Sequence, residues 1–183
     1  VLITQSGGGC RASNYIPLIR KALKAEFPKV PVMSLNFSGL EKGNGLQFGI
    51  TDLIKLVYAI YYGDLIMTCY NQTMPYEKVA GSSAAARERC VAAMKKALDD
   101  RSYRKLKRCA RLILREFSAV PVELTPKVKV GIVGEIYVKY SPLGNSHLED
   151  FLLSEGCEPV VPALMDFILY CVVNNINDAA FYN

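Results

Sequence analysis

Short apolar runs alternate with amphipathic stretches along most of the chain, and this alternation is the pattern of a parallel sheet with crossover helices. The apolar runs predict five strands, over residues 1–5, 32–36, 65–69, 127–133 and 158–161. Apolar positions repeated at helical spacing predict helices between these strands, over residues 12–27, 51–62, 146–156 and 163–174. The pattern therefore predicts an α/β fold.

We expect this fold to be a doubly wound, mainly parallel sheet of about five strands, similar to a Rossmann fold. Two of its helices have end signals in the sequence. Thr51 is a typical N-cap, and Gly63 fits the left-handed position after the helix over residues 51–62. Ser146 and Glu149 have the spacing of a capping box, and glycine at position 156 is expected to end the helix that follows.

A helical excursion interrupts the predicted sheet between its third and fourth strands. Ser83 is a candidate N-cap for a helix that runs to residue 98, and a second helix follows over residues 102–117. We expect a single domain over residues 1–183, in which residues 83–117 stand off the sheet as a helical lobe. We also expect this domain to be a fragment of a longer chain.

The helical lobe carries half of all Lys and Arg residues. Residues 87–116 contain eleven of the 22 Lys and Arg residues but only four of the 17 Asp and Glu residues. This stretch therefore has a net charge of +7. The rest of the chain sums to −2. Long basic helices bind phosphate groups or acidic proteins, and no nucleic-acid-binding motif accompanies these helices. We therefore expect a solvated or protein-docking face, and no nucleic-acid partner.

Composition narrows the class of protein. A hydrophobic fraction of 51% in 183 residues supports a core. The longest apolar tract, residues 50–62, contains Asp52 and Lys55 and is too short to cross a bilayer, and no secretory signal is visible. We therefore expect a cytoplasmic protein with no membrane partner. The six cysteines lack the spacing of a disulfide scaffold or a zinc site.

Candidate chemistry begins at the loop after the first predicted strand. Gly7, Gly8 and Gly9 allow backbone N–H groups to converge at a helix start, which favours an anion, and Cys10 follows directly. The helix dipole and Arg11 would stabilise a thiolate there, so that Cys10 is a candidate nucleophile or metal ligand. In the alternative interpretation, the glycines form a tight turn and the cysteine simply packs.

Further polar residues are expected at the same edge of the predicted sheet, because the carboxyl ends of parallel strands share one edge. Candidate binding residues in these loops are Gln5, Asn36 and Glu135. Asn71 would lie in the loop after the third strand, and Cys69 would end that strand and could face the same site. The loops are therefore expected to converge.

Two segments resemble a known family, residues 5–15 (QSGGGCRASNY) and residues 131–145 (GIVGEIYVKYSPLGN). Together with residues 63–65 and 75–77, they are similar to the large proteins related to the activator of (R)-2-hydroxyglutaryl-CoA dehydratase, and the resemblance spans essentially the whole chain. Members of that family resemble fusions of an actin-like ATPase activator region with a dehydratase-like, iron-sulfur-binding region. This chain resembles only the second region.

The resemblance implies an iron-sulfur-associated electron-transfer domain. Cys10 would be a ligand of a [4Fe-4S] or double-cubane cluster in the full-length protein, with Cys69 as a weaker candidate, while Gln5 and Arg11 would tune the cluster. An ATPase activator region is the implied partner, and acyl-CoA is a candidate ligand. The full-length protein would be an ATP-dependent activator or dehydratase-type reductase. The segment alone is expected to hold no cluster and to be non-catalytic.

Two other functions fit the same residues. In the first, the glycine-rich loop and the loops rich in Asn and Tyr form a non-redox binding module for a phosphate-bearing ligand such as coenzyme A. In the second, the domain is a structural lobe that docks the ATPase activator through its basic helices. Iron and sulfide in the reconstituted full-length protein would distinguish the redox function from these two.

Overall fold

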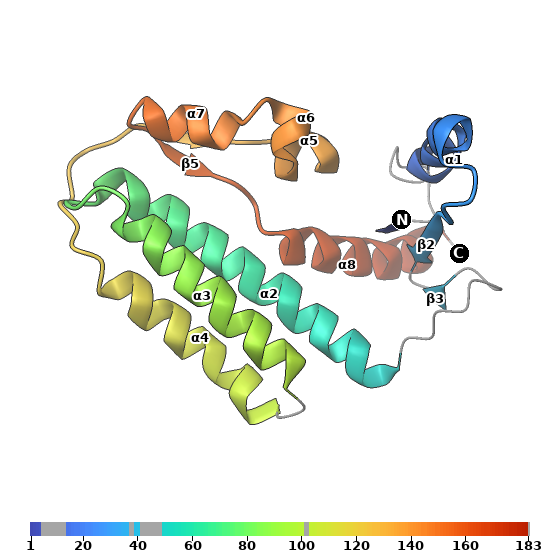
Figure 1. Cartoon of the computed structure of the whole chain (residues 1–183), viewed down its shortest axis with the longest axis horizontal. Helices are drawn as coiled ribbons and strands as arrows, with labels where there is room; N and C mark the ends of the chain where they lie inside the picture. Colours follow the sequence, from blue (N-terminus) through green and yellow to red (C-terminus); the bar gives the residue numbers. More distant parts are fainter. Residues whose placement is uncertain (5–13, 37–38, 41–48, 101–102, 183) are drawn as a thin grey trace. The chain divides into compact units, whose positions relative to one another are not determined.

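The computed structural model is mostly helical, with helix accounting for 68% of the structure (Figure 1). It describes residues 1–4, 14–36, 39–40, 49–100 and 103–182. The chain forms two compact units, Val1–Ile50 and Thr51–Asn183. The described strands form one three-stranded and one two-stranded sheet. The predicted doubly wound sheet of about five strands is therefore wrong, because no continuous sheet joins the predicted strands in the described residues.

The amino-terminal unit follows the predicted pattern. Strands β1 (Leu2–Thr4) and β2 (Met33–Asn36) pair in parallel, and helix α1 (Tyr15–Glu26) connects them. Strand β3 (Gly39–Leu40) pairs with β2 in the antiparallel direction. A parallel pair needs a crossover connection, which the helix supplies. The first two predicted strands and the helix between them are confirmed.

Helix α2 (Ile50–Thr73) is a single helix of 24 residues, where the sequence predicts a helix, a turn and a strand. Gly63 lies inside this helix instead of ending it. Tyr62 and Ile66 are buried one turn apart, and the Tyr62 hydroxyl donates a hydrogen bond of 2.6 Å to the Leu106 carbonyl oxygen. Packing of this face outweighs the cost of one glycine in a helix, about 1 kcal/mol. The predicted third strand is therefore wrong.

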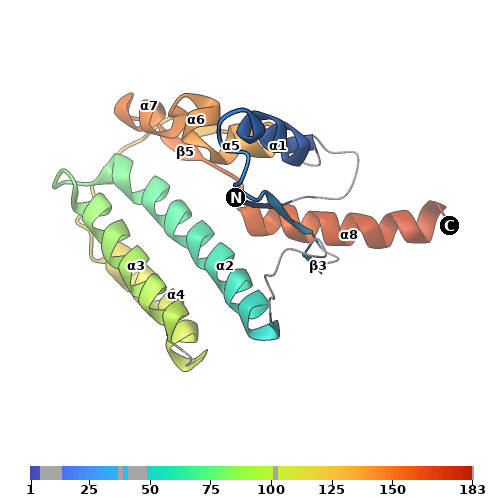
Figure 2. The same cartoon turned by 45° about the vertical axis from the view of Figure 1, so that its right-hand side comes forward.

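Helices α3 (Ser82–Asp99) and α4 (Tyr103–Ser118) confirm the two helices predicted for the basic lobe, and they lie side by side as a pair (Figure 2). Glu77 caps the start of α3, a role that the sequence assigns to Ser83. The Glu77 carboxylate accepts hydrogen bonds from the backbone N–H groups of Gly81 and Ser83 at 2.7 and 2.8 Å. Burial alone would raise the pKa of Glu77, but these hydrogen bonds lower it below its ordinary value.

The hydrophobic core of the second unit lies between α2, α3 and α4. Each helix contributes buried residues to it, and α4 is the clearest case of an amphipathic helix, with an apolar face toward the core and a charged face away from it. The buried residues of this core are Tyr62, Ile66, Ala86, Cys90, Ala97, Leu106, Cys109, Ile113, Phe117 and Val120. The opposite face of α4 is exposed to solvent, whereas α2 also contacts a second hydrophobic cluster through Met67.

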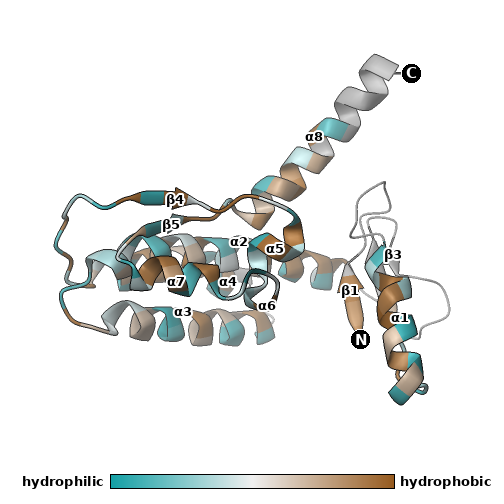
Figure 3. Cartoon of the chain, turned by 90° about the horizontal axis from the view of Figure 1, so that it is seen from above, coloured by the Kyte–Doolittle hydropathy of each residue, from teal (hydrophilic) through white to brown (hydrophobic). Residues whose placement is uncertain are grey.

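Strands β4 (Lys129–Gly131) and β5 (Glu158–Val160) pair in parallel and form the second sheet (Figure 3). They correspond to the last two predicted strands. Glu158 is only 3% exposed, and its carboxylate accepts hydrogen bonds from the Tyr76 hydroxyl at 2.6 Å and from Lys129 Nζ at 2.9 Å. Burial alone would raise the pKa of Glu158, but these two donors lower it below its ordinary value. The paired carboxylate joins the sheet to the turn that follows α2.

Between β4 and β5 the chain forms short helices, where the sequence predicts a loop and one capped helix. These helices are α5 (Ile136–Tyr140), α6 (Pro142–Asn145) and α7 (Leu148–Ser154). The predicted capping box is wrong, because Ser146 and His147 both have left-handed backbones, with φ of 55° and 58°, and His147 forms no side-chain cap. Asn145 Oδ1 instead accepts a hydrogen bond of 3.2 Å from the Leu148 backbone N–H. Gly156, with φ of 73°, follows the end of α7 as predicted.

Helix α8 (Leu164–Tyr182) confirms the last predicted helix and extends it. Its start is capped by Asp64 of α2. The two carboxylate oxygens of Asp64 accept hydrogen bonds from the backbone N–H groups of Leu164 and Met165 at 3.0 and 2.8 Å. This cap satisfies two donors that have no partner within the helix, and it fixes the start of α8 against α2.

One segment of the described residues is long and apolar enough to cross a membrane, by length and composition only. It is α2 with the turn after it, Ile50–Tyr76, and an 18-residue window in it has a mean hydropathy of 1.2 and is 11% buried. The apolar tract is longer than predicted because the helix continues through Gly63. Core helices pass the same test, and the carboxyl-terminal half of α2 packs in the helical core. The expected absence of a membrane partner stays a prediction.

Candidate functional site on helix α4

The residues predicted to bind a cluster or ligand are distributed over both units and over a loop outside the described residues. Asn36 ends β2 in the first unit, where it pairs with Gly39. Glu135 precedes α5, and its carboxylate accepts a hydrogen bond of 3.1 Å from the Tyr137 backbone N–H, so that it acts as an N-cap. The predicted site residues that lie outside the described residues are Gln5, Gly7, Gly8, Gly9, Cys10 and Arg11.

Cys69 lies inside α2, not at the end of a strand, and its half-buried side chain packs against the helical core. Burial raises the pKa of the Cys69 and Cys109 thiols, and it raises the pKa of Cys90 to about 11. Such thiols stay protonated at neutral pH, whereas metals bind the thiolate. In the described part of the chain, no three His, Cys, Asp or Glu side chains are grouped to hold a metal ion.

A groove of about 470 Å³ lies between α2, α3 and the segment that contains α6 and α7. Asn71, which is predicted to lie in a loop, is buried in its wall on α2, and Asn71 Nδ2 donates a hydrogen bond of 2.7 Å to Glu149 Oε2. The Arg87 guanidinium carbon lies 4.3 Å from the centroid of the Tyr70 ring. Asp150 adds a second carboxylate to the lining. The charges of the groove are therefore mixed and do not select a phosphate-bearing ligand.

Helix α4 has one buried face and one strongly basic face. Leu106, Ile113 and Phe117 are almost fully buried in the helical core. The opposite face carries four exposed arginines, separated by four, three and four residues, which we name the arginine stripe. Its members are Arg104, Arg108, Arg111 and Arg115. At about 100° per residue, they fall within an arc of about 60° around the helix.

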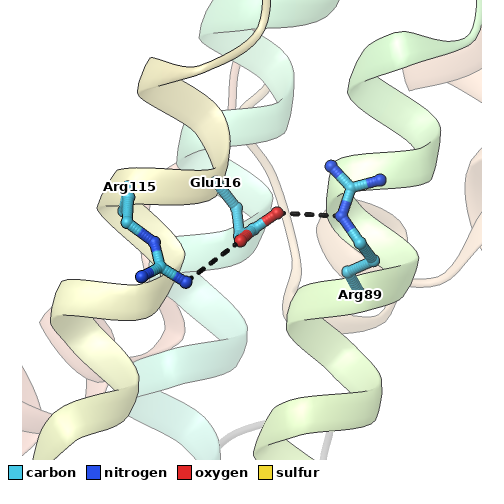
Figure 4. A network of polar contacts seen from close by, with 3 residues as sticks. All are labelled: Arg89, Arg115 and Glu116. Carbon is cyan, nitrogen blue, oxygen red and sulfur yellow. Dashed lines mark hydrogen bonds and ion pairs between the residues drawn. The ribbon is translucent and has the colours of Figure 1, made fainter.

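Two carboxylates pair with cations near the ends of α4. Glu116 joins the helices of the basic pair, because Glu116 Oε2 lies 2.8 Å from Arg89 Nε on α3 and Oε1 lies 3.5 Å from Arg115 Nη2 (Figure 4). Asp100 pairs with Lys105 in the first turn. The hydrogen bond from Arg89 holds the pKa of Glu116 below its ordinary value. Glu116 is therefore ionised at neutral pH, but it contacts only one arginine of the stripe.

The other three arginines of the stripe, and Lys107 beside them, have no ion pair or hydrogen-bond partner among the residues that the structure describes. Like charges three or four positions apart on a helix repel one another by about 0.2–0.5 kcal/mol per pair. Arg111 has three such neighbours, which are Lys107, Arg108 and Arg115. The stripe therefore lowers the stability of the isolated chain, and an anionic partner would relieve the repulsion.

The sequence predicts the basic lobe and, within it, Arg104 and Arg108 one turn apart on a solvated face, and both are exposed in the structure. It does not predict the full stripe, although the spacing of the four arginines is visible in residues 104–115. Combining that spacing with the apolar positions of the same helix would have separated the two faces. No sequence pattern of this kind predicts the groove between α2, α3 and α7. Its buried hydrogen bond joins Asn71 and Glu149, which are 78 residues apart in the chain.

Comparisons with known protein families, with curated proteins and with solved structures find no match to this chain. The resemblance to proteins related to the dehydratase activator therefore stays a prediction. The iron-sulfur cluster, the acyl-CoA ligand and the cytoplasmic location stay predictions as well.

Proposed function

We propose that the second unit is a docking module, which binds an acidic surface of a protein partner through the arginine stripe. The observation that carries the proposal is the exposure of Arg104, Arg108 and Arg111, which have no carboxylate partner among the described residues. Arginine binds carboxylates through two parallel hydrogen bonds, which gives both energy and orientation. Because the opposite face of α4 is buried, the stripe has a fixed orientation toward solvent.

Two features favour a protein over a nucleic acid as the partner. Leu114, which is 51% exposed, borders the stripe and offers an apolar contact of the kind found in protein interfaces. The positive charge is concentrated in α3 and α4, while the chain outside residues 87–116 has a net charge of −2. A long polyanion would gain from the basic helices but not from the rest of the molecule.

The family resemblance supports a particular partner, the ATPase activator region. In that assembly, the chain would belong to an electron-transfer protein that works with acyl-CoA dehydratases, and Cys10 would be a cluster ligand. The basic helices would then position the activator, and they would not ligate the cluster themselves. Support for the redox role comes from the sequence of residues 5–15 and 131–145 alone.

Charge reversal on the stripe tests the docking function. The double variant Arg104→Glu, Arg108→Glu reverses two exposed charges one turn apart. We expect it to weaken binding to the ATPase activator region by about 10–100-fold and to flatten the salt dependence of binding. Lys95→Glu with Lys96→Glu is the matched control, because both lysines are exposed on α3 and the net charge changes equally. Circular dichroism checks that the helices are retained.

An unchanged affinity in the stripe variant would overturn the proposal. Equal losses in the stripe variant and the lysine control would also overturn it, because binding would then respond to net charge and not to this face. Duplex DNA provides the third comparison. Tight, stripe-dependent binding of DNA without binding of the activator region would identify a nucleic-acid interface instead.

A further inference from the structure

We infer that the surface bound by the arginine stripe is an acidic α-helix, whose carboxylates occupy four positions separated by four, three and four residues. This inference rests on the proposed function and adds to it the secondary structure and the spacing of the partner. The observation that carries it is the regular spacing of four exposed arginines along one helix whose opposite face is buried.

The stripe is a straight row along α4. A helix rises 1.5 Å per residue, so the backbone positions of Arg104 and Arg115 lie about 16 Å apart along the helix axis. Successive arginines are separated by about 4.5–6 Å, close to one helical turn. The row therefore has the axial repeat of an α-helix.

An acidic helix laid along α4 has this same repeat, so that four carboxylates and four guanidinium groups can pair together. An extended strand presents side chains on one face every 6.6–6.8 Å, roughly. Over three steps its backbone positions overshoot the stripe by about 4 Å, so the outer side chains must bend toward one another before they can pair. A disordered acidic segment can reach every arginine, but it loses conformational entropy when it becomes ordered on the stripe. A preformed helix avoids that cost.

The stripe is fixed in place before a partner arrives. Leu106 and Ile113 anchor the opposite face of α4 in the core, at 2% and 0% exposure. Lys107 and Leu114, seven positions apart, border the stripe on the same side, and both are exposed. This border adds one charged and one apolar contact, as at the edge of a helix pair. The surface therefore matches a helix more closely than it matches an isolated anion.

The spacing is the same in both directions, so the partner helix can lie parallel or antiparallel to α4. Helix dipoles favour the antiparallel arrangement. In an antiparallel pair, Arg111 faces the second of the four carboxylates counted from the amino end of the partner helix. In a parallel pair, it faces the third. The two arrangements therefore predict different pairs.

Synthetic peptides provide the test, with fluorescence anisotropy as the measurement. The matched peptide is a helical, alanine-rich sequence with four Glu residues at the predicted spacing. The dispersed peptide has the same composition, with its Glu residues distributed around the helix. A third peptide keeps the matched spacing but has a central proline that breaks the helix. We expect the matched peptide to bind about tenfold tighter than either of the others at low salt.

Equal affinity for the three peptides would overturn this inference and leave the docking function intact, because binding would then depend on charge alone. If none of the peptides bound, the inference would also be overturned, and the charge-reversal experiment would decide the docking function separately. The two proposals can therefore fail independently.

A double-mutant cycle supplies a second readout. Arg111→Gln is combined with Glu→Gln at the second or the third acidic position of the matched peptide. Coupling at the second position indicates an antiparallel pair, and coupling at the third indicates a parallel pair. Lys95→Gln on α3 is the control and is expected to show no coupling. Absence of coupling at both positions would contradict the predicted register.

Discussion

Replacing Arg111 by glutamine is expected to stabilise the isolated chain, although it removes a charged residue from the surface. Arg111 lies in the middle of the arginine stripe, and Lys107, Arg108 and Arg115 are its neighbours three or four positions away. No carboxylate within the described residues pairs with it. Glutamine and arginine have similar helix propensities, so the substitution changes mainly the charge.

The expected gain follows from the number of repulsive pairs that are removed. Each pair costs about 0.2–0.5 kcal/mol, so the loss of three pairs raises the free energy of unfolding by about 0.6–1.5 kcal/mol at low salt. For a helical unit of this size, the corresponding rise in Tm is about 2–6 °C. At 1 M salt the Debye length falls to about 3 Å, and most of the difference between the variant and the unchanged chain should disappear.

Urea unfolding followed by circular dichroism, at low and at high salt, measures this gain. Lys95→Gln is the control, because Lys95 is exposed on α3 and has Asp99 four positions after it. That substitution removes an attractive pair and should lower stability slightly. If Arg111→Gln were as destabilising as Lys95→Gln at low salt, the reasoning would be refuted, because Arg111 would then have a favourable partner in the isolated chain.

Three further predictions concern the caps, the sheet and the glycine-rich loop. Asp64→Ala removes both acceptors at the start of α8 and should lower the free energy of unfolding by about 1–2 kcal/mol in urea titrations, while an unchanged value would show that this cap is dispensable. Because the pKa of Glu158 is lowered in the folded chain, its ionised carboxylate stabilises the fold fully above the ordinary carboxyl pKa of about 4.3. This contribution is lost as the pH falls through the folded-state pKa. Glu158→Gln should therefore reduce the loss of stability at acid pH, measured by urea unfolding over a series of pH values. In the full-length protein, Cys10→Ser should lower the iron and sulfide content with little change in thermal stability, and a full cluster in the variant would make Cys10 a turn residue.

The sequence predicts a helix or strand correctly where its residue pattern fits only one type of secondary structure. The helical spacing of residues 12–27 between two short apolar runs correctly predicts α1 and the parallel pair β1 and β2. The two basic helices are predicted to within about two residues at each end, which is the usual uncertainty of helix boundaries. Local patterning therefore accounts for these parts of the fold.

The predicted third strand fails for a physical reason. A short apolar run such as residues 65–69 fits a buried strand and a buried helix equally well, and Gly63 made the strand more plausible. Contacts made after folding decide between them, because Tyr62 on the same helix donates a hydrogen bond to Leu106, which is 44 residues away. No pattern within the segment contains that information.

Part of the candidate site can be predicted from the sequence, and part of it cannot. The basic charge and the spacing of the stripe are properties of one continuous segment, so they are available from the sequence. The partners of the charged residues outside the stripe cannot be read from the sequence. Glu116 binds Arg89 on another helix, and Asp64 caps a helix 100 residues later. Which arginines stay without a partner among the described residues is therefore known only from the structure.

The most direct test of the docking function is a nuclear magnetic resonance titration of the arginine Nε–Hε signals with the ATPase activator region, each signal being assigned by a single Arg→Lys replacement. The account predicts that the signals of Arg104, Arg108 and Arg111 shift together as the partner is added, while the signal of Arg20 on α1 stays in place. Binding of the activator region with no shift in the three stripe signals would contradict the claim that this face of α4 is the docking surface.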